Sequence, residues 1–172
     1  MNRIHLATAL VRRGDTILLV ASTYPNQPQP LWNLPGGRQL DGELLSETAL
    51  RELHEETGFQ GTLGELCYVS ESYDGDTHFA NFTFAVNVSP NDPSLPLRAA
   101  RSARGPSIPQ DDNSTHHDTK DHVVGVEWVP IAALAERIAV AVVREPLLAY
   151  LRGELKGYAG YAEAGISIVF PD

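Results

Sequence analysis

The stretch from Gly37 to Phe59, GRQLDGELLSETALRELHEETGF, constrains this chain more than any other. Glu52, Glu55 and Glu56 are three and four residues apart, so a helix over Glu43 to Thr57 would bring the three carboxylates onto one face. Like charges on one face repel each other unless a cation neutralises them. Because hard divalent cations such as Mg²⁺ prefer carboxylate oxygens, the stretch predicts a divalent-metal site.

The other positions of this stretch favour a helix that packs against a sheet. Leu45, Ala49 and Leu53 recur at a spacing of four residues and form an apolar stripe. Gly58 follows directly and suits a helix stop. A glutamate-rich helix taken alone is more often a solvated surface helix. The preceding turn, Leu34-Pro35-Gly36, favours the functional interpretation because it lets the backbone approach a ligand closely.

Length and composition are typical of one enzyme domain. The chain has 172 residues, of which 42% are hydrophobic and 20% charged, enough for a substantial core. Its net charge of −9 opposes nonspecific attraction to a nucleic acid polymer. The sequence has no apolar run long enough to cross a bilayer and no signal-peptide pattern, so we expect a cytoplasmic protein without a membrane partner. The oligomeric state stays open.

The order of apolar runs predicts mixed α and β structure in a single domain. The turns Arg13-Gly14-Asp15 and Asp74-Gly75-Asp76-Thr77 indicate two hairpins, and the proline-rich segment from Tyr24 to Pro30 indicates a loop. We expect strands over residues 4–12, 16–21, 62–73, 78–88 and 122–129, and helices over 131–139 and 144–152, with Pro146 in the first turn of the second helix.

The segment from Ser89 to Lys120 interrupts this order. It carries five prolines and no sustained periodicity, and so long a loop in a compact domain is usually functional or disordered. We therefore predict a loop insertion at about residues 89–120 that selects the substrate. The candidate polyphosphate contacts are Arg98, Arg101 and Arg104, for which a solvated basic face is the alternative, and the candidate additional metal carboxylates are Asp118 and Asp121.

A glycine, five residues, a glutamate, seven residues and then Arg-Glu-Leu-x-Glu-Glu-x-Gly-Phe form the Nudix box, and the chain resembles Nudix hydrolases. The lead-in from Trp32 to Gly37 and the late strand from Val126 to Pro130 are also similar, so the resemblance covers roughly residues 4–152. It implies an α/β fold, an α/β/α sandwich with a mixed central sheet, and a single domain over residues 1–172. It also implies hydrolysis of a nucleoside diphosphate linked to another group.

The same resemblance implies a Mg²⁺ site, at which Mn²⁺ can substitute. Glu55 and Glu56 would be the main metal ligands, and the carbonyl of Gly37 would be a further one. Glu52 would be either another ligand or the general base that takes a proton from water.

Two arginines also receive roles from the resemblance. Arg51 would orient Glu52 or pair with Glu43. Arg38, directly after the glycine pair, occupies a position where a basic residue stabilises the departing phosphate.

By elimination the expected substrate is a small-molecule nucleotide, a nucleoside di- or triphosphate. The first proline after the box is Pro90, whereas ADP-ribose hydrolases of the family often place one about fifteen residues after it. Trp32, Tyr24 and Phe79 are candidates for stacking on a base, although aromatic residues in strands are more often core. The alternatives are hydrolysis of ADP-ribose, a nucleotide sugar or a dinucleoside polyphosphate, and a non-catalytic nucleotide-binding module.

Overall fold

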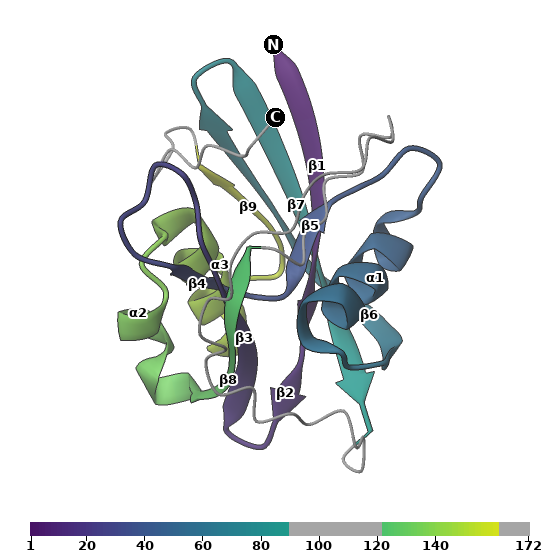
Figure 1. Ribbon diagram of the computed structural model, residues 1–172, viewed down its shortest axis with the longest axis vertical. Coiled ribbons are helices and arrows are strands. Elements are labelled where there is room, and N and C mark those ends of the chain that lie inside the picture. Colours follow the sequence, from purple (N-terminus) through teal and green to yellow (C-terminus); the bar gives the residue numbers. More distant parts are fainter. Residues whose placement is uncertain (90–121, 162–172) are drawn as a thin grey trace, which may run out of the picture.

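The computed structural model describes residues 1–89 and 122–161, in which helices pack on both sides of β-structure (Figure 1). Residues 90–120 of the predicted insertion and the five candidate residues, Arg98, Arg101, Arg104, Asp118 and Asp121, lie outside the described part of the chain. In chain order the elements are β1 (Asn2–Leu10), β2 (Arg12–Arg13), β3 (Thr16–Ser22), β4 (Leu31–Asn33), β5 (Gly36–Arg38), α1 (Leu45–Thr57), β6 (Gly61–Asp74), β7 (Thr77–Val88), β8 (Val123–Pro130), a 3₁₀ turn (Ile131–Ala133), α2 (Leu134–Arg137), α3 (Ala141–Leu151) and β9 (Gly157–Tyr161).

The larger of two sheets has the strand order β5-β1-β7-β6-β9. β1 runs parallel to β7 and β6 runs parallel to β9, whereas the β1–β5 and β6–β7 pairs are antiparallel. The smaller sheet joins β2, β3 and β4, and β8 also pairs with β3. The predicted mixed sheet and the predicted hairpin of β6 with β7 are both confirmed.

Helix α1 covers one face of the larger sheet, and α2 and α3 lie on the other side (Figure 1). Side chains alternate along a strand, so successive residues of β1 enter different cores: Ala9 belongs to the core under α1 and Leu10 to the core under α3. Leu53 of α1 is fully buried in the first core, which stabilises the fold by roughly 2 kcal/mol. The predicted α/β/α sandwich is thereby confirmed.

Both ends of α1 follow from local sequence. At its start, the N–H of Leu44 donates to the carboxylate of Glu47 at 2.8 Å. At its end, the N–H of Gly58 donates to the carbonyl of His54 at 2.8 Å. Gly58 has φ 79°, a left-handed conformation that glycine adopts without the penalty of a Cβ. The predicted stop is confirmed, and the helix begins two residues after the predicted Glu43.

The first hairpin differs from the prediction. The turn at Gly14 joins only the short β2 to β3, because the chain leaves the larger sheet after Leu10. β1 pairs instead with β7, so that Ile4 lies opposite Phe79. A parallel partner more than sixty residues away in sequence leaves no local signal, and only the tertiary pairing reveals it.

The two C-terminal helices also differ from prediction. The first is only a 3₁₀ turn followed by the four-residue α2, because Ile138 turns to an extended conformation and is fully buried in the core. The second begins at Ala141, three residues earlier than predicted, so Pro146 lies inside α3 instead of in its first turn. Pro146 has no N–H to donate to the carbonyl of Val142. Strand β9 was not predicted. No helix of the described residues is long and apolar enough to cross a membrane.

Candidate active site

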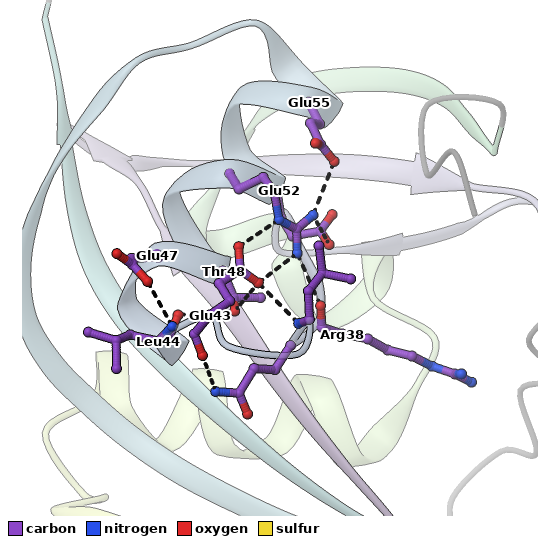
Figure 2. Close-up of polar contacts among 10 residues, drawn as sticks. Arg38, Glu43, Leu44, Glu47, Thr48, Glu52 and Glu55 are labelled. Carbon is purple, nitrogen blue, oxygen red and sulfur yellow. Dashed lines mark hydrogen bonds and ion pairs between the residues drawn. The ribbon is translucent and has the colours of Figure 1, made fainter. Parts of the chain in front are cut away.

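Arg51, in the middle of α1, joins three glutamates of the box (Figure 2). Its Nε donates to Glu43 Oε1 at 2.7 Å, and its Nη1 donates to Glu52 Oε1 at 2.8 Å and to Glu55 Oε2 at 3.1 Å. Its Nη2 donates to the carbonyl of Arg38 at 3.1 Å. The planar guanidinium offers donors in a fixed fork, so one side chain sets the positions of three carboxylates and of the end of β5.

Glu43 ties the loop before α1 to the helix itself. Its Oε2 accepts from the N–H of Leu40 at 3.1 Å and from the hydroxyl of Thr48 at 2.7 Å. Its carbonyl accepts from Gln39 Nε2 at 2.6 Å. The hydrogen bond from Arg51 lowers the pKa of Glu43 from 4.5 to about 2. Glu43 is therefore a charged anchor and not a proton carrier.

Glu52 is 1% exposed and lies directly beneath β5. A Cβ on Gly37 would collide with the Glu52 carboxylate, so a larger residue at this position would displace that carboxylate. Glu52 Oε2 is buried and has no hydrogen-bond partner within the described residues. An unsatisfied buried carboxylate oxygen is costly, and such an atom is a candidate ligand for a cation.

Glu56 is held by the other glycine of the pair. The N–H of Gly36 donates to Glu56 Oε2 at 2.8 Å. A Cβ on Gly36 would collide with the carbonyl of Ala7 and with Thr8, so glycine is needed for β5 to pack closely on β1. The Gly36–Gly37 pair thus brings backbone against two carboxylates and against a neighbouring strand at once.

Burial and mutual repulsion both act on the inner carboxylates. Burial is the main cause that raises the pKa of Glu52 and of Glu56, and the negative charge of Glu52 raises the pKa of Glu56 further. Arg51 lowers both values and offsets only part of this effect. The site therefore holds more negative charge than its one cationic side chain stabilises.

The box residues suit a hard divalent cation by their chemistry. Within residues 1–89 and 122–161, no three Asp, Glu, His or Cys side chains already converge on one point, because Glu52 and Glu55 both face Arg51. The available donors are nonetheless carboxylate and backbone oxygens, which Mg²⁺ and Mn²⁺ prefer. The unpartnered Glu52 Oε2 and the raised pKa values both fit a site that a cation completes.

A cleft adjoins the box between the larger sheet and the start of α3. It is lined by Gly36 and Gly37 of β5, by Phe79 of β7 and by Val142 of α3. Tyr24, from the proline-rich loop, also lines the cleft. Burial, together with the negative charge of Glu56, raises the pKa of Tyr24 to about 12. The cleft and the carboxylates are therefore parts of one site.

The floor of this cleft carries polar side chains from three strands: Thr8, Ser70 and Asn81 line it, and the fully buried Thr83 contacts Thr8 and Asn81. Thr8 of β1 and Thr83 of β7 share a hydrogen bond of 2.8 Å between their hydroxyls. Asn81 Nδ2 lies 3.4 Å from Thr8 Oγ1 and 3.3 Å from Thr83 Oγ1. Ser70 of β6 pairs with Asn81 across the strands and also lines the cleft. An apolar core would be expected at this face of a sheet, so its polarity indicates a binding surface.

Two candidate residues lie away from these groups. Trp32 does not line the described part of the cleft; the guanidinium of Arg137 lies 4.8 Å from its ring centre, and it packs against the core under α3. Arg38 takes part in the network through its carbonyl, whereas its side chain points away from the labelled glutamates (Figure 2). The other two aromatic candidates, Tyr24 and Phe79, share the cleft.

The polar residues at the floor of the cleft were not predicted from the sequence. Thr8, Asn81 and Thr83 stand in apolar stretches, LATAL and FANFTF, where each looks like an ordinary strand residue. The available signal was period-two alternation, which assigns Asn81 and Thr83 to one face of β7. That Thr8 faces the same way depends on the parallel pairing of β1 with β7.

Comparison with known proteins agrees with this fold and identifies the family. The sequence profile of the NUDIX domain matches residues 2–151, so the chain belongs to that family, and the resemblance seen in the box is confirmed. The solved structure of a NUDIX hydrolase from Nitrosomonas europaea superposes with a TM-score of 0.64 at 20% identity, covering 91% of this chain and 93% of that one.

Two relatives have named activities. A Bacillus subtilis (strain 168) protein with the name "Putative 8-oxo-dGTP diphosphatase" is 56% identical over 54 residues, 31% of this chain and 34% of that protein. Diphosphoinositol polyphosphate phosphohydrolase 3-alpha of Mus musculus is 36% identical over 78 residues, 45% of this chain and 44% of that protein. The matched segments span less than half of either relative.

Proposed function

We propose that this protein is a Mg²⁺-dependent pyrophosphohydrolase that cleaves a phosphoanhydride bond in a nucleoside di- or triphosphate. The observation that carries the proposal is the contiguity of two surfaces. Gly37 lies against the Glu52 carboxylate and also lines the cleft that contains Tyr24 and Phe79. A ligand in the cleft therefore has its phosphate end beside the glutamates of the box.

In this proposal the glutamates of the box and the carbonyl of Gly37 form the metal site. Glu55, Glu56 and the carbonyl of Gly37 would hold the metal, with Glu52 as a further ligand if it does not act as the base, and with Mn²⁺ as a substitute for Mg²⁺. When bound, the cation offsets charge on the phosphoryl oxygens and makes water a better nucleophile at neutral pH.

The protein's own contribution is position and proton transfer. Arg51 holds Glu52 and Glu55 in place through its fork of donors. Glu52 is our candidate to accept the proton of the attacking water, because its buried Oε2 has no other partner in the described chain. Arg38, next to Gly37, is our candidate to stabilise the departing phosphate by a movement of its side chain toward the box.

The lining of the cleft is better suited to a nucleotide than to a diphosphoinositol polyphosphate. The described lining combines aromatic and aliphatic side chains with hydroxyl and amide groups and with the carboxylates of Glu71 and Asp74, and it contains no Lys or Arg. A substrate such as that named for the murine relative carries many phosphates and needs cationic partners. A base with an unphosphorylated sugar suits this lining better. A cytoplasmic location stays a prediction from the sequence alone.

The direct test is a substrate panel with the full-length protein. Nucleoside di- and triphosphates, ADP-ribose, nucleotide sugars, dinucleoside polyphosphates and a diphosphoinositol polyphosphate are incubated with Mg²⁺, with Mn²⁺ or with a chelator, and products are identified by mass. We expect metal-dependent release of phosphate or pyrophosphate from a nucleoside di- or triphosphate. Turnover of only the inositol compound, or turnover that survives the chelator, would contradict the proposal.

A further inference from the structure

Asn81, at the centre of the polar floor, carries a hydrogen-bonding group that the fold does not use. Its Oδ1 is buried and has no hydrogen-bond partner within the described residues. Its Nδ2 faces the two threonine hydroxyls at 3.3 and 3.4 Å, longer than the usual N–H···O distance of about 2.9 Å. The carboxamide is therefore loosely held, with its acceptor unsatisfied.

Leaving that acceptor unpaired destabilises the fold. A leucine in the same place would remove the unsatisfied atom, and the walls of the cleft are already apolar at Leu6, Val142 and Val143. A polar group that the fold does not satisfy is explained if a ligand satisfies it. In this orientation of the carboxamide the partner is a hydrogen-bond donor, because the NH₂ end faces Thr8 and Thr83.

The position of Asn81 in the sheet fits one part of a nucleotide. Asn81 lies opposite Leu6 on β1, and Leu6 lies opposite Arg38 on β5. Asn81 is thus two strand spacings, roughly 10 Å, from the strand that touches the carboxylates. That distance is comparable with the span of a nucleoside from its 5′-phosphate to the far edge of its base.

We infer that Asn81 is a specificity-determining residue whose carboxamide oxygen accepts a hydrogen bond from the amino group of the substrate's base. The inference rests on the proposed nucleotide hydrolysis and narrows its substrate class. Adenine, cytosine and guanine carry an exocyclic amino group, whereas uracil and hypoxanthine do not. A base without the amino group would leave Asn81 Oδ1 unpaired beneath the ligand, which lowers affinity.

The test uses nucleotide pairs that differ at the amino group. We expect kcat/KM to favour CTP over UTP, ATP over ITP or GTP over ITP by roughly tenfold or more in at least one pair, mainly through KM, as for one lost hydrogen bond. N81L should bring that ratio close to one while turnover stays metal-dependent. N81D keeps an acceptor and should keep the preference.

Two further variants make the result specific. N87L changes an exposed asparagine on the same strand and should leave the ratio unchanged. If N81L does not fold, N81S, which is too short to reach the base, should show the same loss of ratio. A preference that persists in N81L or N81S, or a wild-type ratio near one in all three pairs, overturns the inference.

A binding measurement separates this inference from the proposed activity. Calorimetry of CMP, UMP, AMP, GMP and IMP without metal should show the same preference and the same dependence on Asn81. Asn81-dependent binding without hydrolysis of any nucleotide would refute the activity and keep the inference. Hydrolysis without Asn81-dependent discrimination would refute the inference alone. If the protein neither binds these nucleotides nor hydrolyses any of them, both the proposed activity and the inference are refuted.

Discussion

The two faces of the larger sheet are built from polar groups in different ways. On the α1 side, three glutamates close to one another in sequence form ion pairs with Arg51, with nitrogen–oxygen distances between 2.7 and 3.1 Å. Under α3, neutral residues from three strands meet at the floor of the cleft, and the contacts of Asn81 are 3.3 and 3.4 Å long. The difference indicates that the α1 face is preorganised for chemistry, while the α3 face keeps hydrogen-bonding capacity for a ligand.

Removal of a carboxylate on the α1 face should have the largest effect. We expect Glu56→Gln to lower kcat by roughly a thousandfold, because the metal loses a charged ligand. Thermal stability should be unchanged or higher, since the variant no longer buries a charge whose pKa is raised by burial. Steady-state kinetics and a melting curve check both. Glu136→Gln, which removes an exposed charge on α2, is the control, and wild-type turnover in Glu56→Gln would break the assignment.

Loss of the clamp should be the next largest effect. Arg51→Ala releases Glu43, Glu52 and Glu55 together, so we expect kcat to fall roughly a hundredfold with a smaller change in KM. The free energy of unfolding should fall by about 1–3 kcal/mol. Arg152→Ala, at an exposed site, is the control for charge. A variant with only a raised KM would show that Arg51 binds substrate and does not position Glu52.

Steric displacement of Glu52 tests whether close backbone contact matters. Gly37→Ala places a Cβ against the Glu52 carboxylate, so we expect kcat to fall roughly tenfold and stability to fall by about 1–3 kcal/mol. Gly125→Ala, in β8, is the matched control because its Cβ would meet its neighbours at 3.4 Å and beyond. Equal kinetics in both variants would mean that Glu52 tolerates displacement.

On the α3 face, Thr83→Val should change binding more than chemistry. Thr83 is fully buried and its hydroxyl bonds that of Thr8, so we expect a loss of about 1 kcal/mol in unfolding free energy. KM should rise a few-fold with kcat nearly unchanged, since loss of the Thr83 hydroxyl disturbs Thr8 and Asn81, which line the cleft, and leaves the box in place. Thr62→Val, an exposed change on β6, is the control. A drop in kcat alone would show that the two faces are not independent.

The smallest expected effect is the titration of Glu43. Its pKa should be about 2 by NMR and should rise in Arg51→Ala, because the hydrogen bond from Arg51 is the main cause of the shift. Since the folded pKa lies below the ordinary value of 4.5, Glu43 stabilises the fold above that value, and this contribution is lost as the pH falls through about 2. An ordinary pKa in the wild-type protein would contradict the anchor role.

Features that depend on residues close in sequence were predicted, whereas features that depend on pairing between distant strands were not. The β6–β7 hairpin and the stop of α1 at Gly58 depend on neighbouring residues, and both were predicted correctly. The partner of β1 and the presence of β9 depend on strands far away in the chain. The length of α2 depends on the burial of Ile138 in the core.

The sequence by itself determined the charged half of the site. Helical periodicity places Glu52, Glu55 and Glu56 within reach of one another, and the Gly36–Gly37 pair before them indicates a turn where the backbone can approach a ligand closely. The tertiary structure alone decided the neutral half, because parallel pairing of β1 with β7 brings Thr8 beside Thr83 across 75 residues. The geometry of a helix determines which residues close in sequence share a face, whereas contacts between distant strands form only when the chain folds.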